Sequence, residues 1–184
     1  MNKKKTYSLY LFLPYAVTIT LLCGLLFLTL QQTLRLGANE PLVQLSLELS
    51  NRLSKEQEIP HQSPANKIDI SKSISPFFYV YDVNRQFIGT TASINGEEVQ
   101  IPKGVLEAAR KNGQRRVTWQ PAKDVRAALV VVHFKGQSEG FVATGRNLQE
   151  TEALIFKLQV LIGFGWIITL LFVFVSWVWA RKLH

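Results

Sequence analysis

Few residues of this chain have the types and spacing that enzymatic chemistry requires. The sequence contains no G-x-S-x-G, H-E-x-x-H, Walker or G-x-G-x-x-G pattern of the kind that marks a catalytic or nucleotide site. Glu97-Glu98 is the only pair of adjacent acidic residues, and Asp82 stands just before the turn residues Asn84-Arg85. An aspartate in that place caps a turn more readily than it binds a metal. We therefore expect no enzyme, no cofactor and no metal site.

His133 is the residue whose own chemistry suggests a functional role. Histidine titrates near neutral pH, so His133 is a candidate ligand-binding or pH-sensing group. It stands near the end of the apolar run Val125–Phe134, and alternation along a strand would place it on one face with Leu129 and Val131. The alternative is a packed histidine at a strand end. His61 lies in a stretch that reads as a solvated loop.

A second group of polar residues is basic. Arg110, Lys111, Arg115 and Arg116 surround Gly113. Such a cluster could face an anionic ligand or lipid headgroups, and the alternative is a solvated loop.

The overall charge of +8 comes mainly from the flanks of two apolar runs. Six basic residues lie beside these runs: Lys3, Lys4, Lys5, Lys157, Arg181 and Lys182. The segment between the runs is therefore nearly neutral, which excludes the phosphate-binding surface of a nucleic-acid partner. Cys23, the only cysteine, lies inside the first run, so we expect neither a disulfide nor a thiolate metal site.

The two apolar runs, Tyr7–Leu30 and Leu158–Ala180, contain no charged residue. Because about 20 apolar residues suffice for a helix to cross a bilayer, we predict two transmembrane helices in the inner or plasma membrane. The basic flanks place both termini in the cytoplasm by the positive-inside rule. A cleaved signal peptide is the alternative for the first run, but no A-x-A pattern follows it. The expected division is a cytoplasmic N-terminus (1–6), a transmembrane helix (7–30), an extracytoplasmic domain (31–153), a transmembrane helix with its stalk (154–180) and a cytoplasmic C-terminus (181–184).

The first half of the middle segment predicts a helix, a loop and a hairpin. Leucines at roughly helical spacing indicate a helix over 31–58, with a break near Ala38–Pro41 because of Gly37 and Pro41. A proline-containing loop follows over 59–75. The aromatic strand Phe77–Val83, a turn and a returning strand Gln86–Thr91 then form the predicted hairpin.

The second half predicts a short helix and three strands. An Asn95-Gly96 turn precedes a helix over Pro102–Asn112. The strands are expected over 114–119, 125–134 and 140–146. Asn147 and Glu150 have the spacing of a capping box that starts a helix continuing into the second apolar run. The predicted fold class is α+β, an antiparallel sheet with helices on one face, flanked by two transmembrane helices.

Three stretches carry a family likeness: LRLGANEPLVQL (Leu34–Leu45), FYVYDVNRQFIG (Phe78–Gly89) and GFVATGRNLQETE (Gly140–Glu152). With this layout they resemble the extracytoplasmic PAS-like (Cache-type) sensor module of bacterial membrane histidine kinases and chemoreceptors. Such a kinase continues past its second span into a HAMP linker, a phosphoacceptor helix and an ATP-binding domain. Here four residues follow the second run, so we expect either a stand-alone sensor-like protein or a fragment of a longer sensor kinase.

The resemblance implies a small-molecule ligand over the concave face of the sheet, held by Arg, Lys, Tyr or Trp side chains. By that analogy, and with His133 added, the candidate ligand-binding residues are Tyr79, Tyr81, Arg116, Trp119, Arg126 and His133. The alternatives are core packing for the aromatic residues and a solvated edge for the arginines.

The function expected from these features is perception of a ligand or partner outside the cytoplasm in a two-component signalling system. The signal would pass through the transmembrane helices to a second copy of the chain or to a separate membrane protein. The alternative is a structural or assembly protein of the cell envelope whose domain binds no small molecule.

Overall fold

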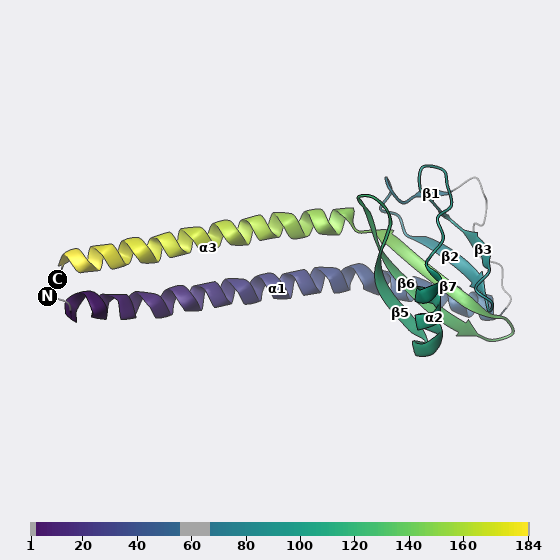
Figure 1. Ribbon diagram of the computed structural model, residues 1–184, viewed down its shortest axis with the longest axis horizontal. Coiled ribbons are helices and arrows are strands. Elements are labelled where there is room, and N and C mark those ends of the chain that lie inside the picture. The colour runs from purple at the N-terminus through teal and green to yellow at the C-terminus, as the bar shows by residue number, and fades with distance from the viewer. Residues whose placement is uncertain (1–2, 56–66, 184) are drawn as a thin grey trace. The chain divides into compact units, whose positions relative to one another are not determined.

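The computed structural model describes residues 3–55 and 67–183, and these residues form an α+β fold (Figure 1). The expected fold class is confirmed at that level. The described residues divide into two compact units, one made of those up to Leu34 and from Ala153 onward, the other of those within Arg35–Glu152. In chain order the elements are α1 (Lys3–Ser54), β1 (Ile68–Asp69), β2 (Phe77–Asp82), β3 (Phe87–Thr90), β4 (Ala92–Ser93), α2 (Lys103–Asn112), β5 (Gln114–Ala122), β6 (Val125–Lys135), β7 (Glu139–Asn147) and α3 (Gln149–Leu183).

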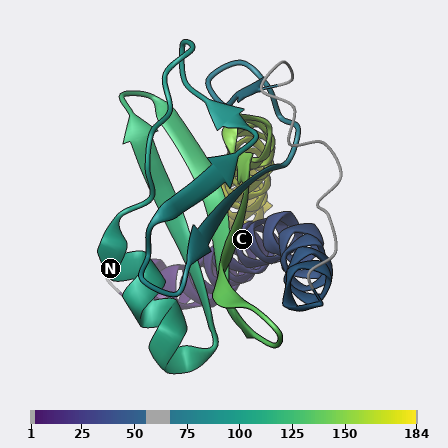
Figure 2. The same ribbon diagram turned by 90° about the vertical axis from the view of Figure 1, so that its right-hand side faces the viewer.

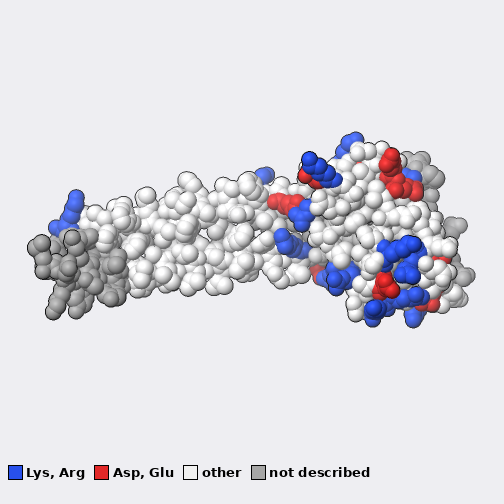
Figure 3. Space-filling model, in the orientation of Figure 1, with Lys and Arg blue, Asp and Glu red and all other residues white. Residues whose placement is uncertain are grey.

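The first unit pairs the beginning of α1 with most of α3. Both helices include stretches long and apolar enough to cross a membrane, and no charged side chain interrupts the middle of the pair on the face that Figure 3 shows. The ring of Phe12 lies 6.3 Å from that of Phe174, edge to face. Trp166 Nε1 donates to Thr20 Oγ1 at 3.1 Å, and Thr20 Oγ1 donates to Ala16 O at 2.8 Å. Among the described residues, aromatic packing and the hydrogen bond from Trp166 to Thr20 join the two helices.

The second unit is built on a five-stranded antiparallel sheet in the order β3-β2-β7-β6-β5. The last strand along the chain, β7, lies between β2 and β6, so that Gly145 is opposite Phe77 on one side and Leu129 on the other. The short strands β1 and β4 form a separate parallel pair. The predicted hairpin and the three predicted later strands are confirmed, with β5 extending to Ala122.

Apolar side chains cover both faces of strand β6, because alternate residues point to opposite faces. Leu129 and Val131 belong to a core that also contains Phe141. Val130 belongs to a second cluster with Leu42 of α1. A strand buried on both faces is expected to read as a continuous apolar run, as β6 does.

Helices accordingly cover both faces of the sheet (Figure 2). Leu106 and Ala109 of α2 are buried in the first core, whereas Leu42 and Val43 of α1 pack against the opposite face. The expectation of helices on one face is wrong. The physical reason is that a strand with two apolar faces would expose one of them unless each were covered.

Helix α1 runs unbroken through the position where a break was expected. Gly37 and Pro41 are both exposed, so water can satisfy the Gly37 carbonyl that loses its helical partner to proline. The helix ends at Ser54 rather than at residue 58. Residues 56–66, with His61 and much of the predicted loop, lie outside the described residues, as do residues 1–2 of the expected cytoplasmic N-terminus and 184 of the C-terminus.

Buried hydroxyl groups fasten α1 to the middle of the sheet. Thr144 Oγ1 on β7 donates to Leu42 O at 2.8 Å and lies 2.6 Å from Ser46 Oγ. Ser46 and Thr144 are both fully buried. Because buried polar groups are stable only when hydrogen-bonded, these contacts fix where along the sheet the helix can lie.

The turn between β6 and β7 closes over the end of α1. Gln137 N donates to Ser54 O at 2.9 Å, and Ser138 Oγ donates to Leu53 O at 2.7 Å. These contacts satisfy carbonyls that the last turn of a helix leaves without partners. A Cβ at Gly136 would lie 2.6 Å from Ser54 O, so the close approach requires glycine.

Two predicted turns are confirmed. Asn95 and Gly96 have φ of 51° and 88°, the left-handed conformation of a two-residue hairpin turn. Asp82 Oδ1 accepts a hydrogen bond from Gln86 N at 2.6 Å. Asp82 therefore caps its turn, as expected from its position.

Candidate functional site

The three aromatic candidates form one cluster on the sheet face that α2 covers. Period-two alternation along β2 places Tyr79 and Tyr81 on this face, and Trp119 joins them from β5. The two tyrosine rings stack at 6.3 Å, and Trp119 meets Tyr79 edge to face at 6.0 Å. Their exposed fractions are 1%, 2% and 7% in chain order, so the cluster lies inside the core.

The two tyrosine hydroxyls differ in their hydrogen bonding. Tyr81 Oη accepts a hydrogen bond from Ile101 N at 3.0 Å, which pins the segment before α2 over the core. Tyr79 Oη is buried and has no hydrogen-bond partner among the described residues. Thr90, its cross-strand neighbour, instead donates to Phe78 O and accepts from Ala92 N. The Tyr79 hydroxyl is thus the polar group of the cluster whose burial no hydrogen bond within the described residues offsets.

Burial also changes the acidity of these phenols. Loss of water around the ring raises the pKa of Tyr79 above its ordinary value, and the charged form of Tyr81 raises it further. The neighbouring Thr90 hydroxyl lowers this pKa, and the charge of Glu98 adds a smaller increase. Burial raises the pKa of Tyr81 as well, against the hydrogen bond from Ile101. Both side chains are therefore neutral at physiological pH, so they can take part in hydrogen bonds but do not supply charge.

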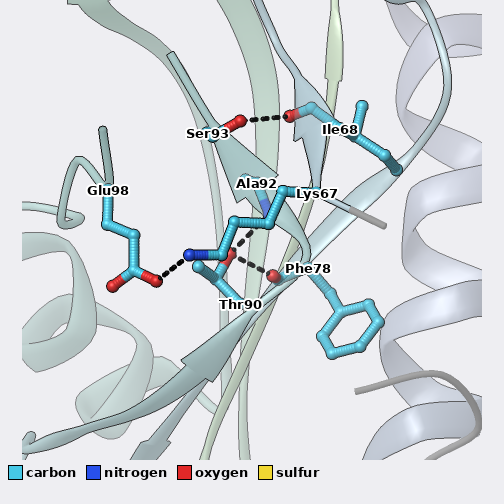
Figure 4. A network of polar contacts seen from close by, with 7 residues as sticks. All are labelled: Lys67, Ile68, Phe78, Thr90, Ala92, Ser93 and Glu98. Atoms are coloured by element: carbon cyan, nitrogen blue, oxygen red, sulfur yellow. Dashed lines mark hydrogen bonds and ion pairs between the residues drawn. The ribbon is translucent and has the colours of Figure 1, made fainter. Parts of the chain in front are cut away.

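A polar network holds the segments that cover the cluster (Figure 4). Lys67 Nζ lies 2.5 Å from Glu98 Oε1, and this ion pair joins the residue before β1 to the segment after β4. Ser93 Oγ on β4 donates to Ile68 O on β1 at 3.5 Å. Lys67 and Glu98 are the charged pair beside the aromatic cluster, and nothing in the sequence pattern pointed to them.

The two candidate arginines lie on the opposite face of the sheet from the tyrosines. Residues 126, 128, 130 and 132 of β6 alternate onto the face that α1 covers. There Arg116 Nη1 pairs with Glu40 Oε1 of α1 at 3.3 Å, and Arg126 Nη1 pairs with Glu152 Oε1 of α3 at 2.5 Å. The structure therefore does not bring these arginines together with Tyr79, Tyr81 and Trp119.

His133 lies at the far end of the aromatic face. Its ring stacks on Phe141 at 4.8 Å, and Nε2 lies 3.0 Å from Glu139 Oε1. Its side chain is 6% exposed. The structure places it as a packed residue of the β6–β7 hairpin.

The basic cluster around Gly113 is exposed. Arg110 and Lys111 lie in the last turn of α2, and Arg115 follows on β5. No ion pair within the described residues involves these three, whereas Arg116 pairs with α1.

The junction between β7 and α3 contains side-chain contacts that the sequence predicted only in part. Asn147 Oδ1 accepts a hydrogen bond from Gln149 N at 2.7 Å, which satisfies one amide at the start of α3. The predicted capping box is not formed, because Leu148 O accepts the first helical hydrogen bond, from Glu152 N, which makes Leu148 the N-cap. Glu150 instead pairs with Arg146 at 3.0 Å. Asn147 Nδ2 also donates to Ile70 O at 2.6 Å, a contact that sequence spacing could not reveal.

The described residues contain no group of three or more His, Cys, Asp or Glu side chains that could hold a metal ion. Comparison with protein-family models, with curated proteins and with solved structures gives no match for this chain. The geometry of the aromatic cluster and of the β7–α3 junction therefore carries the functional argument.

Proposed function

We propose that this chain is a membrane-anchored sensor-like protein with a PAS-like domain outside the cytoplasm. The domain perceives a ligand or partner, and α3 passes the change to another membrane protein, either a second copy of the chain or a separate signalling protein. Two helices that are long and apolar enough to cross a membrane support the anchoring. The basic residues beside them support cytoplasmic termini.

The sheet supports the PAS-like part of the proposal. The five-stranded antiparallel sheet, between a long entry helix and a long exit helix, has the layout on which the resemblance rests. The helix α2 falls between the second and third of these strands along the chain. The N-terminal helix packs on the face opposite α2.

The observation that carries the proposal is the direct passage from the sheet into the last helix. Strand β7 ends at Asn147 and α3 begins at Gln149, with Leu148 alone between them. Leu148 N donates to Arg126 O at 2.8 Å. A change in β7, which lies at the centre of the sheet, therefore moves the start of a helix that is long enough to cross the bilayer.

The ligand site of the proposal is the aromatic cluster. Tyr79 Oη is the buried polar atom there without a partner, and a small molecule that accepts or donates one hydrogen bond would satisfy it. The Lys67–Glu98 ion pair beside the cluster suits a ligand that carries charge at one end. Arg126, on the other face, acts in this proposal as a positioning residue for α3.

A thermal-shift screen of the full chain in nanodiscs against small metabolites tests the sensor function. A ligand present at 100 times its dissociation constant stabilises a protein by about 2.7 kcal/mol, a rise in melting temperature of roughly 10 °C for a domain of this size. We expect Tyr79→Phe to reduce the shift and Arg126→Ala to leave it unchanged. A flat response across the library would remove the small-molecule function.

A docking or assembly role in the envelope is the second candidate, and one observation favours it. Tyr79, Tyr81 and Trp119 are almost fully buried, as expected of a closed core in a rigid spacer. The same screen separates the two functions, because a docking domain gives no shift with any small molecule while remaining folded.

A further inference from the structure

The side-chain amide of Asn147 joins the segment that contains Ile70 to the start of α3. Its amide Nδ2 donates to Ile70 O at 2.6 Å, and its Oδ1 accepts from Gln149 N at 2.7 Å. The side chain is buried, with 5% of the residue exposed. Because the amide is planar, the two atoms cannot move independently. A displacement of Ile70 O turns the amide and takes Oδ1 away from the first turn of α3.

Arg146 makes a second tie between the same two parts. Its Nε donates to Ile74 O at 2.9 Å, and its Nη2 pairs with Glu150 Oε2 at 3.0 Å. Asn147 and Arg146 thus both bind backbone carbonyls of residues 67–75 on one side and the first turn of α3 on the other. We call these four contacts the latch.

Polar contacts hold the 67–75 segment, both within the segment and to residues 91 and 93. Ile68 N and Ile70 N donate to Thr91 O and Ser93 O, and Asp69 Oδ1 accepts from both N and Oγ of Ser71. The segment covers the aromatic core, where Ile70 is fully buried. It is also joined to the segment after β4 by the Lys67–Glu98 pair. A molecule entering the cluster would have to displace this cover.

We propose that the latch couples the 67–75 segment to the start of α3, so that loosening the segment loosens the first turn of the helix. The inference rests on the proposed function for its biological use, but the coupling itself is a property of the domain. The coupling and ligand binding are measured separately, so the failure of one is distinguishable from the failure of the other.

Hydrogen exchange on the full chain in nanodiscs tests the coupling. The Ile68 and Ile70 amides report on the segment, and the Glu152 amide, which donates to Leu148 O at 2.8 Å, reports on the first turn of α3. The segment is loosened by Asp69→Ala, which removes the Ser71 contacts, or by Ile70→Ala, which removes buried side-chain volume. Unchanged protection of β6 amides shows that the domain remains folded.

Asn147→Asp removes the Asn147 link of the latch to Ile70 while keeping the hydrogen bond to the start of α3. The carboxylate still accepts from Gln149 N, but it has no donor for Ile70 O. Gln149→Glu is the matched control, because it adds the same negative charge to the exposed first turn and leaves the Asn147 side chain intact.

With Asn147 present, we expect a loosened segment to raise exchange of the Glu152 amide by about 2- to 30-fold, the range of couplings within protein networks. In the Asn147→Asp variant only the Arg146 contacts still link the segment to α3, so the rise should be smaller. In the Gln149→Glu variant the rise should persist in full. If the exchange rate of the Glu152 amide stays unchanged when the segment is loosened, the proposal is wrong. A segment that neither substitution loosens also overturns it, since the latch then has no movable part.

Discussion

Replacing Tyr79 by phenylalanine removes one buried oxygen atom and nothing else. The ring contacts with Tyr81 and Trp119 remain, and no hydrogen bond is lost because Tyr79 Oη has none. A buried polar group without a partner costs about 1–3 kcal/mol. The void left by one oxygen costs a few tenths of a kcal/mol, at about 24 cal/mol per Å³. We therefore expect Tyr79→Phe to stabilise the domain by about 1–2 kcal/mol.

Tyr81→Phe is the matched control and should have the opposite sign. It removes the acceptor of the Ile101 amide, 3.0 Å from Tyr81 Oη, and Ile101 is 3% exposed. A buried amide left without a partner costs about 1–3 kcal/mol. Two neighbouring, stacked tyrosines that lose the same atom should thus shift stability in opposite directions.

Thermal unfolding of the full chain in nanodiscs, followed by near-ultraviolet circular dichroism, measures both effects. At roughly 4 °C per kcal/mol for a domain of this size, the melting temperature should rise with Tyr79→Phe and fall with Tyr81→Phe. A fall with Tyr79→Phe comparable to that with Tyr81→Phe would show that the Tyr79 hydroxyl is satisfied within the folded protein. It would then cease to mark a ligand site.

Three further predictions concern other parts of the molecule. Gly136→Ala should destabilise the domain by about 1–3 kcal/mol in thermal unfolding, because its Cβ would lie 2.6 Å from the end of α1; an unchanged melting temperature would show that the turn can move away. Trp166→Phe removes the donor to Thr20 and should weaken the pairing of the two long helices by about 0.6 kcal/mol, seen as a broader distance distribution between spin labels on them; an unchanged distribution contradicts it. The hydrogen bond from the Ser71 hydroxyl lowers the pKa of Asp69. The stability this provides is present above the ordinary aspartate pKa of about 3.9 and disappears as pH falls through the lowered value. The difference in melting temperature between the parent chain and Asp69→Asn should therefore shrink in that range, and a pH-independent difference would refute the assignment.

Much of the fold was predictable because its signals are local. The Asn95-Gly96 turn, the β2–β3 hairpin and the helix that ends before Gly113 follow from residues close in sequence. The continuous apolar run of β6 also contained the information that both sheet faces are covered. The expectation of helices on one face is wrong because β6 has two apolar faces, each of which needs a cover.

The remaining features depend on contacts between distant residues. Serine at position 46 weakens the apolar stripe of α1, yet it is buried there because Thr144 meets its hydroxyl. The strands β1 and β4 are two residues long each. They are too short to show the alternation of apolar and polar residues that marks a strand in a sequence. In the candidate site, the grouping of Tyr79 with Tyr81 follows from alternation, whereas the bond from Asn147 to Ile70 joins segments that no local pattern relates.

The central claim of the proposed function is that the sheet domain lies outside the cytoplasm and that α3 crosses the membrane. In a Cys23→Ala background, single cysteines introduced by Asn112→Cys, at the exposed end of α2, and by Lys182→Cys, exposed near the end of α3, are treated with a membrane-impermeant maleimide in intact cells. We expect labelling of the Asn112→Cys variant in intact cells and of the Lys182→Cys variant only after lysis. Labelling of the Lys182→Cys variant in intact cells, with the Asn112→Cys variant protected, would contradict the account.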